Sequence, residues 1–302
     1  NFKYLHHNKA KGWFVLLKKK KIIILGHSGF IGSKLEHLLE KSNTWSIIGR
    51  SLPDVDLTQA GQADLLIPFL ESSSTLVLAA AVKRQFGDTL ETFQANVEIV
   101  RNVCRLLKRY PVKRVVFMSS AAVYGEETEN ISISELTRVN PTSYYGISKY
   151  TAECLLKKTC ANKISLVCLR PPLVYGPSDP GQTYGPSGFS TAAMEGRSIT
   201  LWGDGSELRE FIFIDDLCLL IELIVDNEVE GEVNVVSGTP YCFADIVSIL
   251  KKKCPNLAVD TRSRSRGKAD NAFDASKIKS MLPASFRFTP LEEGLSHLLD
   301  KH

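Results

Sequence analysis

Residues 22–32 read Ile-Ile-Ile-Leu-Gly-His-Ser-Gly-Phe-Ile-Gly, a short apolar run followed by glycines at a G-x-x-G-x-x-G spacing. Residues 33–39 then place apolar side chains at helical intervals. A strand, a glycine turn and a helix in this order present backbone N–H groups and a helix N-terminus to a pyrophosphate. The stretch therefore predicts a dinucleotide-binding turn rather than a purely structural one. Its predicted contact residues are Gly26, Ser28, Gly29, Phe30, Ile31 and Gly32.

Strand-like runs alternate with helical patterns through the first half of the chain, and this predicts a parallel sheet covered by helices on both faces. The fold class is therefore α/β, a doubly wound Rossmann sheet. The expected strands are 22–25, 45–48, 75–78, 114–118 and 164–169, and the expected helices are 30–41, 88–109 and 143–160. After a Pro-, Gly- and Ser-rich stretch, strands are expected at 211–214 and 233–236, and helices near 216–226 and 243–253.

These patterns divide the chain into three expected parts. Residues 1–20 form a basic N-terminal extension that we expect to be poorly ordered, and residues 21–176 form the dinucleotide-binding domain. Residues 177–302 form a smaller C-terminal substrate-binding lobe, from which segments near 211–238 return to the first domain.

Charge and composition narrow the class of partner. The chain of 302 residues has 37 basic and 33 acidic side chains, but residues 1–21 contain lysines and no acid, so the remainder is mildly acidic. We therefore expect no nucleic-acid partner. No apolar run is long enough to span a membrane, and Phe14–Leu17 is too short for a signal-peptide core. Scattered cysteines without a C-x-x-C indicate a reduced, cytoplasmic protein, and the six histidines have no metal-ligand spacing, so no metal is expected.

The end of the second expected strand bears on the choice of cofactor. An acidic residue near this point would accept a hydrogen bond from the adenosine ribose. This chain has Arg50 instead, and a guanidinium suits a 2′-phosphate, so the sequence favours NADP over NAD. An exposed arginine without a ligand is the alternative. Asp56, followed by Leu57, is expected either to contact the adenine or to form a turn.

Small and hydroxyl side chains follow the third and fourth expected strands, where ligands bind in such sheets. Ala79, Ala80 and Ala81 leave room for the cofactor, and Lys83 is expected to reach a phosphate or to face water.

Ser120 follows the fourth strand, and Tyr145 and Lys149 are four residues apart, on one face of the expected helix 143–160. A nearby ammonium is expected to lower the pKa of the phenol, which makes Tyr145 a general acid/base for a substrate hydroxyl that Ser120 holds.

At this point the chain resembles the extended short-chain dehydrogenase/reductase family, the NAD-dependent epimerases and dehydratases that modify nucleotide sugars. The resemblance covers residues 22–299 and is carried by the glycine turn and by Ser120, Tyr145 and Lys149. It is also carried by residues 170–177, 202–211, 215–217 and 291–295. The resemblance implies that Ser120, Tyr145 and Lys149 are catalytic and that Asn96 lies near the cofactor. It also implies that Arg209 and Arg266 hold the substrate diphosphate.

Departures from the subfamily patterns narrow the implied activity. Ala121 and Ala122 replace the acidic pair of the 4,6-dehydratases, and Ala122 and Ser178 replace the Cys and His of the fucose-synthase branch. Arg50 stands where the galactose epimerases have an acid. The resemblance therefore implies a 4-ketoreductase using NADP, with a C4 epimerase that retains NAD as the alternative. A non-catalytic dinucleotide sensor is a further alternative. A nucleoside-diphosphate sugar is the implied substrate, and a homodimer through helices 88–109 and 143–160 is the implied assembly.

Overall fold

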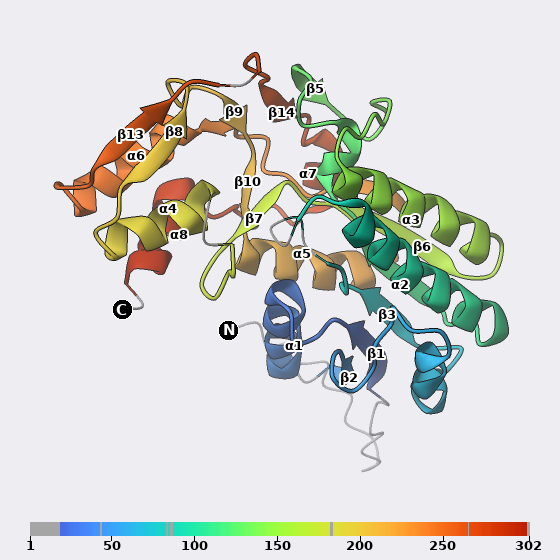
Figure 1. Ribbon diagram of the computed structural model, residues 1–302. Coiled ribbons are helices and arrows are strands. Elements are labelled where there is room, and N and C mark those ends of the chain that lie inside the picture. Colours follow the sequence, from blue (N-terminus) through green and yellow to red (C-terminus); the bar gives the residue numbers. More distant parts are fainter. Residues whose placement is uncertain are drawn as a thin grey trace, which may run out of the picture.

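A parallel six-stranded sheet forms the centre of the computed structural model (Figure 1). The structure describes residues 19–42, 44–82, 84, 87–181, 184–264 and 266–300. In spatial order the strands are β11, β6, β4, β3, β1 and β2, and every neighbouring pair is parallel. Their bounds are β1 (Lys20–Leu25), β2 (Trp45–Arg50), β3 (Thr75–Leu78), β4 (Arg114–Met118), β6 (Ser165–Arg170) and β11 (Gly231–Asn234).

Helices cover both faces of this sheet because alternate strand residues point to opposite sides. Ile22 and Ile24 of β1 pack in the cluster that includes α1 (Phe30–Ser42) and α5 (Ile214–Asp226). Ile23 and Leu25 pack in the cluster that includes α2 (Leu90–Arg109) and α3 (Tyr144–Cys160). The predicted doubly wound α/β fold is confirmed.

Two helix starts differ slightly from their expected positions because capping side chains fix them. The Thr89 side chain accepts a hydrogen bond from the Thr92 N–H, so α2 begins at residue 90 rather than 88. The Ser143 hydroxyl accepts from the Gly146 N–H at 3.0 Å, so α3 begins at residue 144. Both serve as N-caps of the kind that satisfies the free N–H groups of a first helical turn.

A second hydrophobic core lies in the C-terminal part of the chain, at the upper left of Figure 1. It is built mainly from α4 (Gly185–Met194), β8 (Ile199–Trp202), α6 (Phe243–Lys253), β13 (Val259–Arg262) and α8 (Leu291–Leu299). The remaining elements are η1 (Gln62–Phe69), η3 (Ala121–Tyr124), β5 (Asn130–Ile133), β7 (Leu173–Tyr175), β9 (Leu208–Arg209), β10 (Phe211–Phe213), β12 (Tyr241–Cys242), β14 (Asn271–Phe273) and α7 (Ser276–Met281). Thus the expected strand at 211–214 forms outside the large sheet, paired with β7, whereas β11 joins that sheet.

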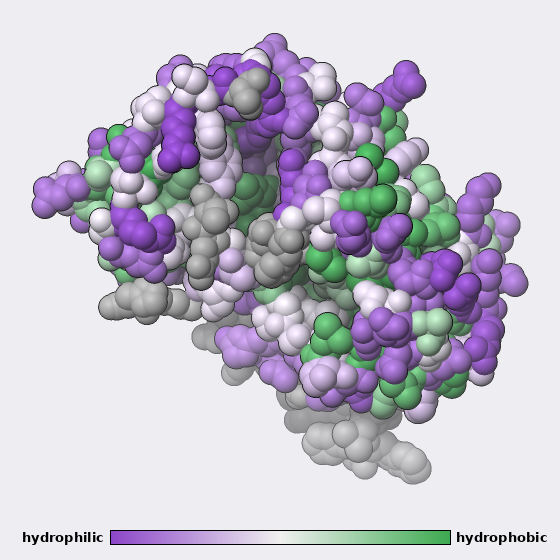
Figure 2. Space-filling view, viewed as in Figure 1, coloured by the Kyte–Doolittle hydropathy of each residue, from purple (hydrophilic) through white to green (hydrophobic). Residues whose placement is uncertain are grey.

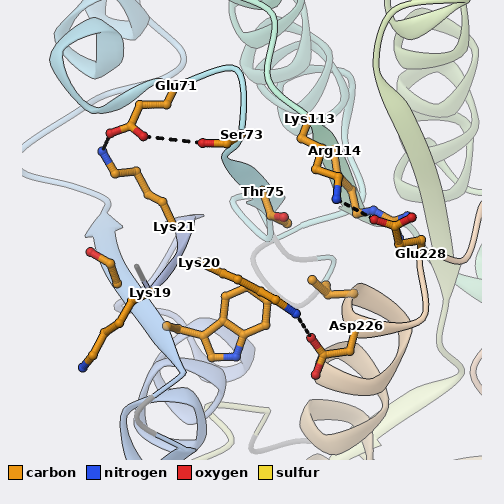
Figure 3. Close-up of a pocket in the computed structure, with 13 residues that line it drawn as sticks. Lys19, Lys20, Lys21, Glu71, Ser73, Thr75, Lys113, Arg114, Asp226 and Glu228 are labelled. Atoms are coloured by element: carbon orange, nitrogen blue, oxygen red, sulfur yellow. Dashed lines mark hydrogen bonds and ion pairs between the residues drawn. The ribbon is translucent and has the colours of Figure 1, made fainter. Parts of the chain in front are cut away.

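A pocket of about 550 Å³ lies at the amino ends of the central strands (Figure 3). Lys20 pairs with Asp226 at 2.8 Å and Lys113 pairs with Glu228 at 2.5 Å across its rim. Because ligands of parallel sheets bind beyond the carboxyl ends of the strands, this pocket is at the opposite edge from the expected site. Among the described residues, no helix is both long enough and apolar enough to cross a bilayer.

The glycine turn between β1 and α1 is shaped by close backbone approach. Gly26 has a φ of 88°, in the left-handed region that favours glycine. A Cβ atom at Gly32 would lie 2.1 Å from the Gly26 carbonyl oxygen, so a side chain there would push α1 away from the turn.

We expect Gly32→Ala to lower the free energy of unfolding by about 1–3 kcal/mol, the usual cost of overpacking. Gly267→Ala is the matched control, because a Cβ there meets nothing within 4 Å. Urea unfolding of both variants tests this expectation, and equal stability of the two would contradict it.

Candidate active site

The three candidate catalytic side chains come together at the carboxyl end of β4. Ser120 is the N-cap of the short helix η3, and its hydroxyl accepts a hydrogen bond from the Ala122 N–H at 3.1 Å. Gly146 lets α3 approach this turn, because a Cβ there would lie 2.6 Å from the Ala122 carbonyl oxygen. The Ser120 hydroxyl consequently lies close enough to the phenol of Tyr145 to affect its pKa. The structure thus joins a strand end and a helix that lie about two dozen residues apart in the sequence.

The phenol of Tyr145 is held in its neutral form. Burial raises its pKa to about 12, and the negative charge of Glu126 acts in the same direction. The Ser120 hydroxyl and the positive charge of Arg84 oppose this rise. The expectation that Lys149 lowers the pKa of Tyr145 is wrong for this arrangement, because burial and Glu126 dominate.

Lys149 is buried beneath Tyr145. Its ammonium donates to the Met118 carbonyl at 2.7 Å and lies 5.5 Å from the centroid of the Tyr145 ring. Burial lowers the pKa of Lys149 to about 8, while the Glu153 carboxylate opposes that fall. The ammonium is therefore bound to the end of β4 and faces the ring of Tyr145 rather than pairing with its oxygen.

Arg84 and Glu126 are site residues that the sequence did not reveal. They form an ion pair beside Tyr145, and both affect the pKa of its phenol. One lies in the segment after β3 and the other after η3, 42 residues later. No local pattern links residues so far apart, and only the adjacency of β3 and β4 in the sheet brings them together.

The glycine turn fits a dinucleotide. α1 has no acidic residue in its first turn, so no side-chain carboxylate of its own competes for the N–H groups there. Phe30 and Ile31 are partly buried against the core, and the Ser28 hydroxyl accepts from the Ser51 hydroxyl at 2.7 Å. Gly29 donates its N–H to the Gly26 carbonyl at 3.0 Å and so closes the turn.

Arg50 ends β2 beside this turn. Its guanidinium lies 4.2 Å from the centroid of the Phe69 ring and donates to the Gly49 carbonyl at 2.6 Å. The stacking orients the arginine, an arrangement that the sequence did not predict. A Cβ at Gly49 would lie 2.5 Å from the His27 ring, which itself is 3.1 Å from the Glu36 carboxylate. The space of a side chain at residue 49 is thus already filled.

Other predicted cofactor residues shape the backbone around the strand ends. Asp56 caps its own turn, because one carboxylate oxygen accepts from both the N–H and the hydroxyl of Thr58. Leu57 is buried. The Asn96 side chain donates to the Val82 carbonyl at 3.0 Å and accepts from the Val82 N–H at 2.7 Å.

Residues 79–81 follow β3 as predicted. Ala79 donates its N–H to the Leu25 carbonyl at 2.9 Å, while Ala80 and Ala81 continue the chain toward Val82. Lys83, a predicted phosphate contact, lies outside the described residues.

The two predicted substrate arginines both contact the segment that contains Glu126 and Glu127. Arg209 donates to the Glu126 carbonyl at 3.2 Å, to the Ala269 carbonyl at 2.5 Å and to the Glu207 carboxylate at 2.6 Å. Arg266 forms an ion pair with Glu127. In this arrangement both guanidinium groups are engaged within the protein, and they border the same segment that faces Tyr145.

Comparison with known proteins supports the predicted class of protein, the epimerases and dehydratases that modify nucleotide sugars. The profile of the NAD dependent epimerase/dehydratase family matches residues 22–237. GDP-L-fucose synthase 1 of Arabidopsis thaliana is 27% identical over 94% of this chain and 93% of the relative. GDP-6-deoxy-D-talose 4-dehydrogenase of Aggregatibacter actinomycetemcomitans is 24% identical, over 92% and 96%. The solved UDP-glucuronic acid 4-epimerase from Bacillus cereus, in complex with UDP-glucuronic acid and NAD, has a TM-score of 0.81 at 22% identity, over 93% and 98%.

This chain belongs to the NAD dependent epimerase/dehydratase family. The resemblance to the extended short-chain dehydrogenases and reductases is thereby confirmed, and with it the expectation of an enzyme. Within the described part of the chain, no group of three or more His, Cys, Asp or Glu side chains is arranged to hold a metal ion.

We expect Glu126→Gln to lower the pKa of Tyr145 from about 12, because the variant removes a negative charge that disfavours the phenolate. Arg84→Gln should shift that pKa the opposite way. NMR spectra of ¹³C-labelled tyrosine, recorded over the alkaline range in which the protein stays folded, follow the titration, and Tyr145→Phe assigns the signal. Glu129→Gln is the control, because Glu129 is exposed and lies three residues after Glu126. Shifts in the same direction for both variants would contradict the assignment.

Proposed function

We propose that this protein is an NADP-dependent reductase that acts on the C4 carbonyl of a nucleoside-diphosphate sugar. The carrying observation is the grouping of Ser120, Tyr145 and Lys149 at the end of β4, with the phenol ring of Tyr145 placed over the Lys149 ammonium. A phenol whose pKa lies near 12 is protonated at neutral pH, so it is ready to give a proton to a substrate oxygen. That is the protonation state which reduction of a ketone requires.

The proposed mechanism assigns one task to each side chain. Ser120 donates a hydrogen bond to the carbonyl oxygen and orients it. Tyr145 gives its proton to that oxygen as negative charge develops there, while Lys149, bound to the Met118 carbonyl, packs beneath the Tyr145 ring and fixes its position. The glycine turn would hold a nicotinamide dinucleotide, which, when bound, would supply the hydride to the carbonyl carbon.

Arg50 supports NADP as the cofactor. Its guanidinium is held at the end of β2 by the Phe69 ring, and no acidic side chain extends from the neighbouring Gly49. A planar guanidinium binds phosphate oxygens in pairs, whereas it gives a ribose hydroxyl no acceptor.

A C4 epimerase that retains NAD is the second candidate function. The observation that favours it is the fold match to UDP-glucuronic acid 4-epimerase in complex with NAD. An epimerase needs the same proton donor, but its tyrosine must also accept a proton. The two functions therefore differ in whether the cofactor is consumed.

The assembly and location are also proposed. Leu90 of α2 and Tyr144 and Ile147 of α3 are exposed, and apolar side chains gather over this part of the surface in Figure 2. We assign this face to a homodimer formed through α2 and α3. All seven cysteines are free thiols, which supports a reducing, cytoplasmic location.

A panel of UDP-, GDP-, dTDP- and CDP-linked 4-keto sugars tests the proposed function. We expect one class to consume NADPH, and Tyr145→Phe to lower turnover by roughly 10²–10⁴-fold with NADPH affinity retained, because it removes the proton donor and little volume. Conversion of a 4-hydroxyl sugar to its epimer without net NADPH oxidation would favour the epimerase. Undiminished turnover by Tyr145→Phe would overturn the mechanism.

Arg50→Asp should raise the Kd of NADP by about 10–100-fold, the loss expected for a charged hydrogen-bonded contact of roughly 1.5–3 kcal/mol. The Kd of NAD should not rise, since NAD has no 2′-phosphate. Arg105→Asp on the exposed face of α2 makes the same change in net charge and serves as the control. Fluorescence titration with each cofactor measures the two Kd values and their ratio. Equal loss of NADP affinity in the two variants would mean that Arg50 does not contact the phosphate.

A further inference from the structure

A buried ion pair lies directly behind the candidate active site. Glu153 of α3 and Arg170 at the end of β6 have 0% and 3% of their side-chain surface exposed. Two hydrogen bonds join them, from Nη2 to Oε2 at 2.6 Å and from Nε to Oε1 at 2.9 Å. This fork geometry is the strongest that an arginine and a carboxylate can adopt.

The pair holds both ends of the segment that contains Ser120. At one end, the Ser119 hydroxyl donates to Oε1 of Glu153 at 2.5 Å. At the other end, Nη1 of Arg170 donates to the Tyr124 hydroxyl at 2.8 Å. Ser120 lies between these two anchors, so its position relative to α3 depends on them.

Glu153 lies on the same face of α3 as two of the candidate catalytic residues. Tyr145, Lys149 and Glu153 follow one another at intervals of four residues and therefore share that face. Lys149 faces the Met118 carbonyl, the rings of Phe117 and Tyr145, and the charge of Glu153.

We propose that the Glu153–Arg170 pair is the positioning element of proton transfer. It fixes Ser120 against Tyr145 through Ser119 and Tyr124, and the Glu153 carboxylate keeps a positive charge on the buried Lys149. The proposal rests on the proposed function for the identity of the proton donor, but the pair itself touches neither substrate nor cofactor.

Stability alone does not account for such a pair. Removing two charges from water costs about as much as their attraction returns, so well-packed apolar side chains often stabilise a protein equally well. The ion pair provides directed hydrogen bonds to Ser119 and Tyr124, which apolar side chains cannot provide.

Burial also lowers the pKa of Lys149 to about 8, and Glu153 limits that fall.

A second buried arginine in the same sheet offers a matched comparison. Arg114, also 3% exposed, begins β4 at the opposite edge and lines the pocket in Figure 3. It donates to the carbonyls of Ile224 and Val229 at 3.2 and 3.0 Å, and these bonds hold the end of α5. Arg114 therefore has a structural role, and it lies at the opposite edge of the sheet from Tyr145.

The first experiment cuts one anchor at a time while keeping both charges. We expect Ser119→Ala and Tyr124→Phe each to lower kcat by about 3–30-fold, with KM for NADPH and sugar unchanged, because a displaced Ser120 weakens only the reacting geometry. Arg114→Lys should lower the Tm without changing kcat. An unchanged kcat in both anchor variants would overturn the proposal. A kcat that falls in proportion to the Tm in the two anchor variants and in Arg114→Lys would overturn it as well.

The second experiment needs no substrate, so it separates this proposal from the proposed function. NMR of ¹³C-labelled lysine follows the Lys149 ammonium, with Lys149→Met to assign its signal. We expect Glu153→Gln to move the pKa of Lys149 below about 8, so that its charge is lost at lower pH. An unshifted titration would overturn the electrostatic part of the proposal. If the wild-type protein reduces no sugar in the panel, the proposed function fails, and this titration still decides the role of Glu153. If Glu153→Gln does not fold, the two anchor variants decide the positioning role of the pair.

Discussion

The Glu153–Arg170 ion pair is the contact on which the arrangement of the candidate site depends. It joins α3 to the end of β6, and through Ser119 and Tyr124 it also holds the turn between them. The Tyr124 hydroxyl donates in turn to Asn234 at the end of β11, so the network reaches the edge strand of the sheet. Breaking one partner would leave a buried, unpaired charge, which is far more costly than the pair is stabilising. The network therefore holds three strand ends and one helix in a single arrangement.

The electrostatics of Tyr145 follow from this packing. Because α3 packs against the turn, the phenol is desolvated, and desolvation outweighs the effects of the Ser120 hydroxyl and the positive charge of Arg84. Lys149 is subject to the same burial, but its charge is supported by Glu153. The result is a neutral phenol above a cation, and this phenol carries the proton that donation to a substrate oxygen requires.

Local patterns predicted the sheet, the glycine turn and the grouping of Ser120, Tyr145 and Lys149, because each depends on residues close in sequence or on strand order. The sign of the Tyr145 pKa shift was not predictable in this way. A four-residue spacing places Lys149 on the same helix face, but it does not show that the ammonium is bound to a strand carbonyl. The sequence did not reveal Arg84 or the stacking of Arg50 on the Phe69 ring, because the partners of these side chains lie in other elements. Whether Arg209 and Arg266 bind a diphosphate remains a prediction, since both are engaged within the protein.

Those two arginines connect the C-terminal part of the chain to the acid–base chemistry. Arg209 binds the carbonyl of Glu126 and Arg266 pairs with Glu127, while the Glu126 carboxylate raises the pKa of Tyr145. A diphosphate that drew on these guanidinium groups would compete with the acidic segment for them. Any movement of Glu126 away from Tyr145 would then make the phenol a stronger acid. Because the same short segment borders both Tyr145 and the two arginines, a diphosphate bound to Arg209 or Arg266 would affect the phenol through Glu126 without a rearrangement of the sheet.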